Sequence, residues 1–164
     1  KVLIVGANGS GKTTLMHEII AHPEWICGVR AGVMCQQYTE MLPESLTPVA
    51  FLNPDGDKTR MTRARTTLGA LKLTREEMMH PIGALSGGQR AKVLWLSLIL
   101  QAPELLLLDE PTRNLSPLSS PVVRNLILTF PGPVLCITHD RVLMDMWPGR
   151  ILRLTSQGLL SDLS

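Results

Sequence analysis

The feature that most constrains this sequence is a glycine-rich segment near its start, Gly6-Ala7-Asn8-Gly9-Ser10-Gly11-Lys12-Thr13. It matches the pattern G-x-x-x-x-G-K-[ST] and follows Val2-Leu3-Ile4-Val5, an apolar run typical of a strand buried on both faces of a parallel sheet. From Lys12 to Ala21 the apolar positions recur at helical spacing, until His22-Pro23 ends the pattern. Strand, glycine turn and helix in this order predict a phosphate-binding loop.

The chemistry of such a loop follows from its backbone. Amide N–H groups of a glycine-rich turn can point inward at phosphate oxygens, and the positive end of the following helix dipole favours an anion. Lys12 is then expected to reach the β- and γ-phosphates of a nucleotide, and the Thr13 hydroxyl to bind Mg²⁺. The predicted nucleotide contacts are Gly6, Ala7, Asn8, Gly9, Ser10, Gly11, Lys12, Thr13 and Thr14.

Two more apolar runs end in residues that suit this chemistry. Leu105–Leu108 leads into Asp109 and Glu110, and Val134–Ile137 is followed after one residue by His139. Because ligands bind at the carboxyl ends of strands in open α/β sheets, we expect these side chains and the loop at one sheet edge. Asp109 is suited to hold Mg²⁺, and Glu110 to orient or deprotonate the attacking water. Solvated acids and a structural histidine are the alternative interpretation.

The rest of the chain predicts an alternating order of strands and helices. A strand is expected within residues 28–36, a largely buried helix at 89–101, a helix at Val122–Leu128 and a last strand at 150–155, followed by a frayed end. Between these, prolines and a turn cluster break any sheet pattern, whereas Thr62–Leu73 has helical spacing. We therefore predict one domain, residues 1–164, with a three-layer α/β/α fold, a mostly parallel sheet and a helical insertion over approximately residues 40–84.

Composition narrows the class further. A net charge of +2 gives no general argument for nucleic acid. Four cations nevertheless cluster, as a solvated helix face or a contact for an anionic partner: Lys58, Arg60, Arg63 and Arg65. Three cysteines without a C-x-x-C pair argue against disulfides and a zinc site and favour the cytoplasm. No apolar run approaches the ~18 residues that a membrane-spanning helix needs.

Several of these segments stand in the order of an ATP-binding cassette (ABC), and the sequence closely resembles that family from residue 1 to about 155. The most diagnostic is Leu85-Ser86-Gly87-Gly88-Gln89, because other P-loop families have no such signature ahead of the Walker B strand. The other segments are the Walker A loop with Lys12, the Q-loop with Gln36, the Walker B strand with the residues after it (Leu105–Thr112), the D-loop that follows up to Pro117, and the H-loop Thr138-His139-Asp140-Arg141.

The resemblance implies an ATPase that uses ATP and Mg²⁺. In the family, the Q-loop glutamine, here Gln36 or its neighbour Gln37, touches Mg²⁺ and the attacking water, and His139 would lie near the γ-phosphate. Ser86, Gly87, Gly88 and Gln89 open a helix and would contact the nucleotide held by another cassette. ATP would thus join two cassettes, which belong to one longer chain or to a homodimer. An N-terminal β-subdomain with an adenine-stacking aromatic would precede this chain, and Tyr38 is not expected to replace that aromatic.

Within the family, the chain is most similar to the F-type cassettes, which act on ribosomes and in some cases protect them from antibiotics. The resemblance rests on Thr138–Arg141, on Gln89-Arg90-Ala91-Lys92 and on the short insertion. It implies the ribosome, with its RNA and transfer RNA, as partner. Ser116 departs from the usual D-loop aspartate. The alternatives are the ATPase subunit of a membrane transporter that docks a permease, and an ATP-binding switch with little hydrolysis, against which Glu110 argues.

Overall fold

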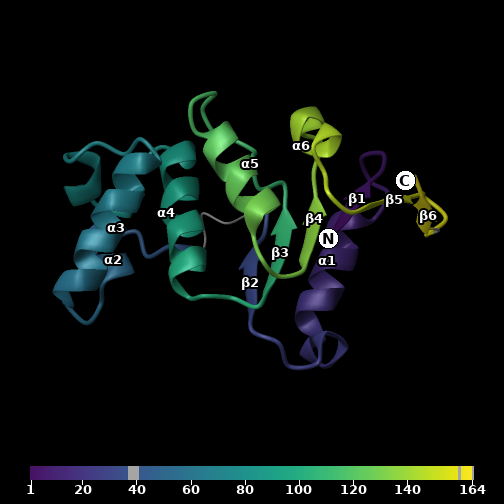
Figure 1. The fold of residues 1–164 in the computed structure, drawn as a ribbon, viewed down its shortest axis with the longest axis horizontal. Coiled ribbons are helices and arrows are strands. Elements are labelled where there is room, and N and C mark those ends of the chain that lie inside the picture. Colours follow the sequence, from purple (N-terminus) through teal and green to yellow (C-terminus); the bar gives the residue numbers. More distant parts are fainter. Residues whose placement is uncertain (37–40, 159, 164) are drawn as a thin grey trace. The chain divides into compact units, whose positions relative to one another are not determined.

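The computed structural model describes residues 1–36, 41–158 and 160–163, so that Gln37 and Tyr38 lie outside the described part. The chain divides into two compact units. One, which we call the sheet unit, comprises Lys1–Gln36, Pro103–Thr112 and Arg124–Ser164. The other, the helical unit, comprises Gln37–Ala102 and Arg113–Val123. Figure 1 shows the strands of the first and the helices of the second.

The sheet unit is built on a six-stranded sheet in the order β2-β3-β4-β1-β5-β6. The first five strands pair in parallel, and β6 is antiparallel to β5. Their bounds are Val2–Val5 (β1), Ala31–Met34 (β2), Leu105–Asp109 (β3), Val134–Ile137 (β4), Arg150–Leu154 (β5) and Leu160–Asp162 (β6). This arrangement confirms the predicted α/β fold with a mostly parallel sheet.

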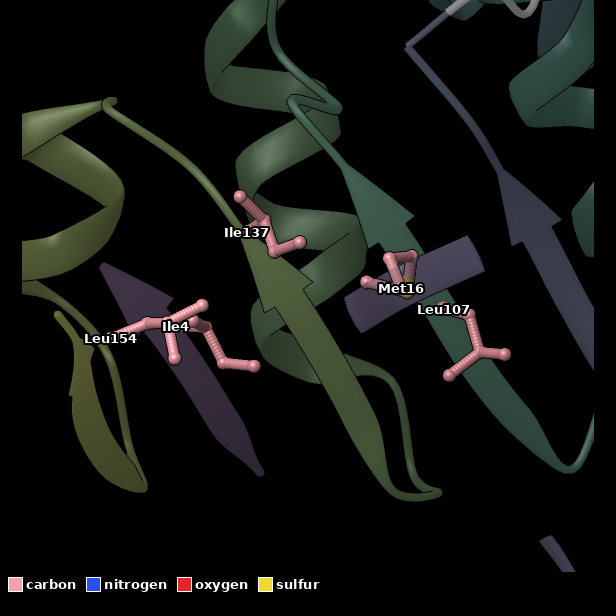
Figure 2. Packing of buried hydrophobic residues seen from close by; sticks show 5 residues of the cluster. All are labelled: Ile4, Met16, Leu107, Ile137 and Leu154. Carbon is pink, nitrogen blue, oxygen red and sulfur yellow. The ribbon is translucent and has the colours of Figure 1, made fainter. Parts of the chain in front are cut away.

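Apolar residues cover the inner strands on both faces. On one face Ile4, Leu107 and Ile137 pack with Met16 of α1 (Lys12–Ala21), as Figure 2 shows. Alternation turns Leu3, Leu108 and Cys136 to the other face, where each is fully buried. Each such side chain contributes about 1.5–3 kcal/mol by leaving water. The loops at the carboxyl ends of these strands are therefore carried by a rigid support.

The end of the chain differs from the frayed end that the sequence predicted. Gly158 adopts a left-handed φ of 76° in a turn whose N–H donates to the Thr155 carbonyl at 3.0 Å, and β6 then returns along β5. Arg150 Nε donates to Asp162 Oδ2 at 2.8 Å across the two strands. The prediction was wrong because β6 spans only three residues, too few to show an alternating pattern.

The helical unit holds α2 (Pro48–Leu52), α3 (Lys58–Ala70) and α4 (Gly87–Leu100), with two short 3₁₀ turns, η3 (Glu77–Met79) and η4 (Ile82–Ala84). Helix α3 begins four residues before the predicted start at Thr62, because Asp57 caps it and accepts from the Arg60 N–H at 2.6 Å. The fourth is buried through most of its length, as predicted.

The basic cluster lies on the third helix, with all four cations exposed. At 100° per residue, Lys58 and Arg65 flank one side of the buried Ala64, and Arg60 and Arg63 flank the other. The cations therefore do not share one face. Three further helices complete the described chain: η1 (Pro23–Ile26), α5 (Ser120–Thr129) and α6 (Arg141–Asp145). Among the described residues, no helix is long and apolar enough to span a membrane.

Candidate nucleotide site

The glycine-rich loop leaves β1 and enters α1 through a backbone that glycine makes possible. Gly9 and Gly11 have φ angles of 78° and 94°, in the left-handed region. A Cβ on Gly6 would lie 2.3 Å from the carbonyl oxygen of Leu154, the last residue of β5. A side chain would therefore clash at Gly6 and strain the backbone at Gly9 and Gly11, so glycine allows the loop to form a tight turn.

Lys12 lies inside this turn. Its side chain is 7% exposed, and Nζ donates to the carbonyls of Gly6 and Ala7 at 2.9 Å each. Gly11, at the N-cap of α1, provides no side-chain hydrogen bond to the first turn of the helix. The Ser10 hydroxyl oxygen is buried without a hydrogen-bond partner among the described residues. A cation, helix amides and an unsatisfied hydroxyl are the groups that a polyphosphate needs.

Asp109 ends β3 at the same edge of the sheet, opposite Ile137 of the neighbouring strand. Its carboxylate is 2% exposed, and neither oxygen has a hydrogen-bond partner in the described part of the chain. A buried carboxylate without a partner is costly unless a cation balances it. The described residues include no group of three or more His, Cys, Asp or Glu able to hold a metal ion. The buried Asp109 carboxylate without a partner nevertheless fits Mg²⁺, which binds through one or two carboxylates together with substrate phosphates.

Glu110 follows in a backbone conformation that is rare for its residue type, with a φ of 52°. Its N–H donates to the Ile137 carbonyl at 2.9 Å, which keeps the residue beside β4. Burial raises the pKa of the Glu110 carboxyl, and the nearby His139 opposes this shift through a backbone N–H and its charge. A carboxylate held in this way is a stronger base than an exposed one.

His139 reaches Glu110 from the end of β4. The His139 N–H donates to Glu110 Oε2 at 3.4 Å, and its ring Nε2 lies 3.7 Å from Oε1. The next residue, Asp140, caps α6 and accepts from Arg124 Nε at 2.7 Å, which anchors the segment. The His139 side chain remains 53% exposed, so its ring is accessible from solvent.

Gln36 lies two residues beyond the end of β2 and is exposed. The register of β2 places Met34 opposite Leu108, so that the segment after it leaves the sheet at the same edge as Asp109. Burial, together with the charge of Asp109, raises the pKa of the intervening Cys35 thiol. The sheet unit therefore collects Lys12, Gln36, Asp109, Glu110 and His139 at the carboxyl ends of its strands.

The signature residues lie in the helical unit, at the start of α4. Ser86 and Gln89 form a capping box: the Ser86 Oγ accepts from the Gln89 N–H at 3.4 Å, and the Gln89 Oε1 accepts from the Ser86 N–H at 2.7 Å. A Cβ on Gly88 would lie 2.6 Å from the carbonyl oxygen of Asn114. These residues line a cavity of about 640 Å³ together with Lys72, Glu77, Lys92, Asn114, Leu115 and Ser116.

Comparison with known proteins identifies the family of the chain. The family model described as ABC transporter matches residues 1–113, which include the Walker A, signature and Walker B segments. The chain belongs to the ABC transporter family. One relative is the ABC transporter F family member 4 of Arabidopsis thaliana, which is 33% identical over 88% of this chain and 22% of that protein. Another is the ribosome protection protein VmlR of Bacillus subtilis, which is 28% identical over 100% of this chain and 31% of that protein.

The fold agrees as well. A dimeric post-hydrolysis state of the ATP-binding cassette MJ0796, bound to ADP and Pi, superposes with a TM-score of 0.77 at 22% identity, over 99% of this chain and 85% of that one. The chain therefore has the fold of an ABC cassette and is similar to F-type members of that family. It spans between about an eighth and a third of the length of the first curated relatives that it matches.

Three residues around the signature of this ABC cassette were missed by sequence reasoning. Glu77, Lys92 and Asn114 all line the cavity, yet none was predicted as a site residue. Lys92 and Asn114 lie in segments compared with the family, whereas Glu77 lies in none. Lys92 alone carried a signal, because a lysine in an otherwise apolar helical run, three residues after Gln89, lies on the same side of the helix as the signature. Glu77 and Asn114 reach the cavity only through the tertiary fold.

Proposed function

We propose that this cassette binds Mg-ATP and hydrolyses it to ADP and phosphate, as part of an F-type protein that acts on the ribosome. The observation that carries the proposal is the buried carboxylate of Asp109, which has no partner among the described residues and lies at the sheet edge that also holds Lys12 and Glu110. A charge in that position is stabilised by a bound cation.

The roles of the residues follow from their chemistry. Lys12 and the amides at the start of α1 bind the phosphates, and Thr13, Asp109 and Gln36 hold Mg²⁺, which would neutralise charge on the phosphate oxygens. Glu110 accepts a proton from the water that attacks the terminal phosphorus while the bond to ADP breaks. His139 lies close enough to Glu110 to orient that carboxylate, and its exposed ring would contact the terminal phosphate.

A second cassette and the ribosome are the proposed partners. The MJ0796 cassette forms a dimer in its post-hydrolysis state, and a start of α4 that faces a cavity with two lysines suits an anion presented by another cassette. The ribosome is supported by the likeness to an F family member and to a ribosome protection protein. ATP would hold the two cassettes closed, and hydrolysis would release them.

The test is phosphate release with Mg-ATP, measured with and without ribosomes. We expect ribosome-stimulated turnover that Lys12→Ala abolishes and Arg75→Ala leaves intact, because Arg75 is an exposed cation outside the basic cluster and outside the signature cavity. Glu110→Gln should bind ATP without hydrolysing it and sediment with ribosomes in an ATP-dependent way. Turnover without any ribosome effect would contradict the ribosomal role and favour a permease as partner; ATP binding without turnover would indicate a switch.

A further inference from the structure

Glu77 connects two parts of the helical unit at the wall of the signature cavity. Its Oε2 accepts from the Thr74 N–H at 2.7 Å, while its own N–H donates to Thr74 Oγ1 at 3.2 Å. The other carboxylate oxygen, Oε1, accepts from the side-chain Nε2 of Gln89 at 2.5 Å. One carboxylate therefore links the turn before η3 to the signature residue at the start of α4.

This contact determines the orientation of the Gln89 amide. An ionised carboxylate can only accept hydrogen bonds, so the Gln89 NH₂ group must face Glu77. The Gln89 Oε1 is then directed to the Ser86 N–H, to which it is bonded at 2.7 Å. Without Glu77, the amide could rotate and present its NH₂ to a backbone donor. The capping box thus depends on a residue outside the signature.

Glu77 also balances a buried cation. Lys92 lies three residues beyond Gln89, one turn along α4, with 7% of its surface exposed, and its Nζ donates to the Lys72 carbonyl at 3.5 Å. Burial lowers the pKa of Lys92, and the charge of Glu77 opposes this shift. The pKa of the Glu77 carboxyl is lowered, mainly by its hydrogen bonds with Thr74, so the side chain is ionised at neutral pH.

We infer that Glu77 is a positioning residue for the signature: it fixes the orientation of the Gln89 amide at the start of α4, and its charge partly compensates that of Lys92 on the wall of the same cavity. The inference rests on the proposed function, in which the signature contacts a nucleotide held by a second cassette. It assigns Glu77 to the signature side of that composite site, acting on a nucleotide bound to the Lys12 of another copy.

Hydrogen–deuterium exchange tests the positioning directly and needs no turnover. In Glu77→Ala, amide exchange in the peptide covering residues 85–90 should rise about tenfold, since a hydrogen bond to a charged group is lost, while the peptide covering residues 6–13 stays unchanged. The matched control is Glu76→Gln, because the exposed Glu76 carboxylate lies 3.8 Å from His80 and outside the cavity. Unchanged exchange in Glu77→Ala, or an equal rise in both peptides, would overturn the inference.

Glu77→Gln separates the two roles. Its single amide oxygen can still accept from Gln89. The bond from the Thr74 N–H is then lost, because the new NH₂ group faces that donor, and the charge beside Lys92 is gone. Exchange in the signature peptide should then stay close to wild type, while the KM for Mg-ATP or kcat in phosphate release changes. A variant with wild-type exchange and wild-type kinetic constants would contradict the proposed balance of Lys92.

Mixing two defective chains tests the assignment to another copy. Lys12→Ala and Glu77→Ala should each release phosphate at least about tenfold more slowly than wild type. An equimolar mixture should recover activity, because a pair of them contains one site with both an intact Lys12 and an intact Glu77. No recovery would overturn the assignment. A wild-type chain without turnover would instead count against the proposed function, while the exchange result would still decide whether Glu77 positions the signature.

Discussion

The starts of α1 and α4 are both glycine-rich helix N-termini, but they satisfy their amides in different ways. The first helix has Gly11 at its N-cap in a left-handed conformation and no side-chain cap. The fourth is closed by the reciprocal Ser86 and Gln89 hydrogen bonds. The first terminus therefore leaves its amides for a ligand, whereas the second is already stabilised by its own side chains. The Walker A turn is suited to hold a nucleotide, and the signature to add a contact to one held elsewhere.

The lysines near the two helix starts, Lys12 and Lys92, also differ in the groups that hold them. Lys12 is held by two neutral carbonyls and meets no acid at hydrogen-bond distance among the described residues. Lys92 is buried to the same extent but is influenced by the carboxylate of Glu77. Lys12 likewise lies within electrostatic reach of a carboxylate, that of Glu110, so the two lysines differ in their direct contacts. Two carbonyls hold Lys12 at 2.9 Å, whereas one carbonyl accepts from Lys92 at 3.5 Å. The following predictions test this contrast.

The largest expected effect is on nucleotide affinity. Lys12→Ala should weaken binding of Mg-ATP at least about a hundredfold, because it removes a charge-assisted contact from a buried site. Lys92→Ala should leave the affinity of the single chain close to wild type. Isothermal titration of each variant with Mg-ATP gives the comparison. Equal losses would show that both lysines act on a nucleotide bound within one copy, which would contradict the contrast.

Replacing a glycine by alanine should change the stability of the protein by an amount that depends on the position of the glycine. Gly6→Ala and Gly88→Ala each place a Cβ less than 3.0 Å from a backbone carbonyl oxygen and should lower the free energy of unfolding by about 1–3 kcal/mol or more. Gly69→Ala is the control, because its Cβ would meet only Met78 Cε at 3.9 Å within a helix. This variant should gain about 0.5–1 kcal/mol. Urea unfolding measures all three, and a neutral Gly88→Ala would show that the Asn114 segment can move aside.

Removing the capping box at the start of α4 should lower the stability of the protein by a smaller amount. Ser86→Ala removes the side-chain acceptor of the Gln89 N–H and should lower the free energy of unfolding by about 1 kcal/mol. For a domain of this size the loss corresponds to a shift in Tm of about 2–4 °C. Added Mg-ATP should raise the Tm of wild type and variant equally, because the nucleotide binds at the other helix start. A reduced shift in the variant would contradict this separation.

The smallest expected effect is a pH dependence at Glu110. Since its pKa is raised in the folded protein, Glu110 binds its proton more tightly there than in the unfolded chain. The folded state therefore loses stability as the pH rises from the ordinary glutamate value through the raised one. Glu110→Gln removes this titration, so the variant should be more stable than wild type at about pH 7 and should lose that advantage at about pH 4. Urea unfolding at both pH values measures the difference in the free energy of unfolding between Glu110→Gln and wild type. The same difference at both pH values would show that the titration of Glu110 is not its cause.

Much of the sheet unit could be predicted because its strands carry local signals. Val2–Val5 and Val134–Ile137 are continuous apolar runs, and the structure gives both the predicted bounds. Other features arise from contacts between distant residues. The left-handed backbone of Glu110 depends on the β4 carbonyl to which its N–H donates, and β6 depends on β5 as a partner. Neither partner is visible in the local pattern.

The signature shows the same limit. The predicted helix began at residue 89, whereas α4 begins at Gly87, because Ser86 and Gln89 form a capping box that includes the two glycines in the helix. The link from Gln89 to Glu77 joins residues on either side of η4 and follows from how the 3₁₀ turns pack. The short spacing in sequence did not reveal it, because a turn of two or three residues carries no periodicity.

The position of β1 within the sheet has a consequence for how the protein is made. This strand pairs with β4 and β5, whose residues follow it by more than a hundred positions. During synthesis the Walker A segment leaves the exit tunnel long before either neighbour exists, and pairings so distant in sequence form slowly. The nascent chain therefore exposes an apolar strand without partners until residues 134–154 have been made, and a complete support for the nucleotide loop has to wait for them.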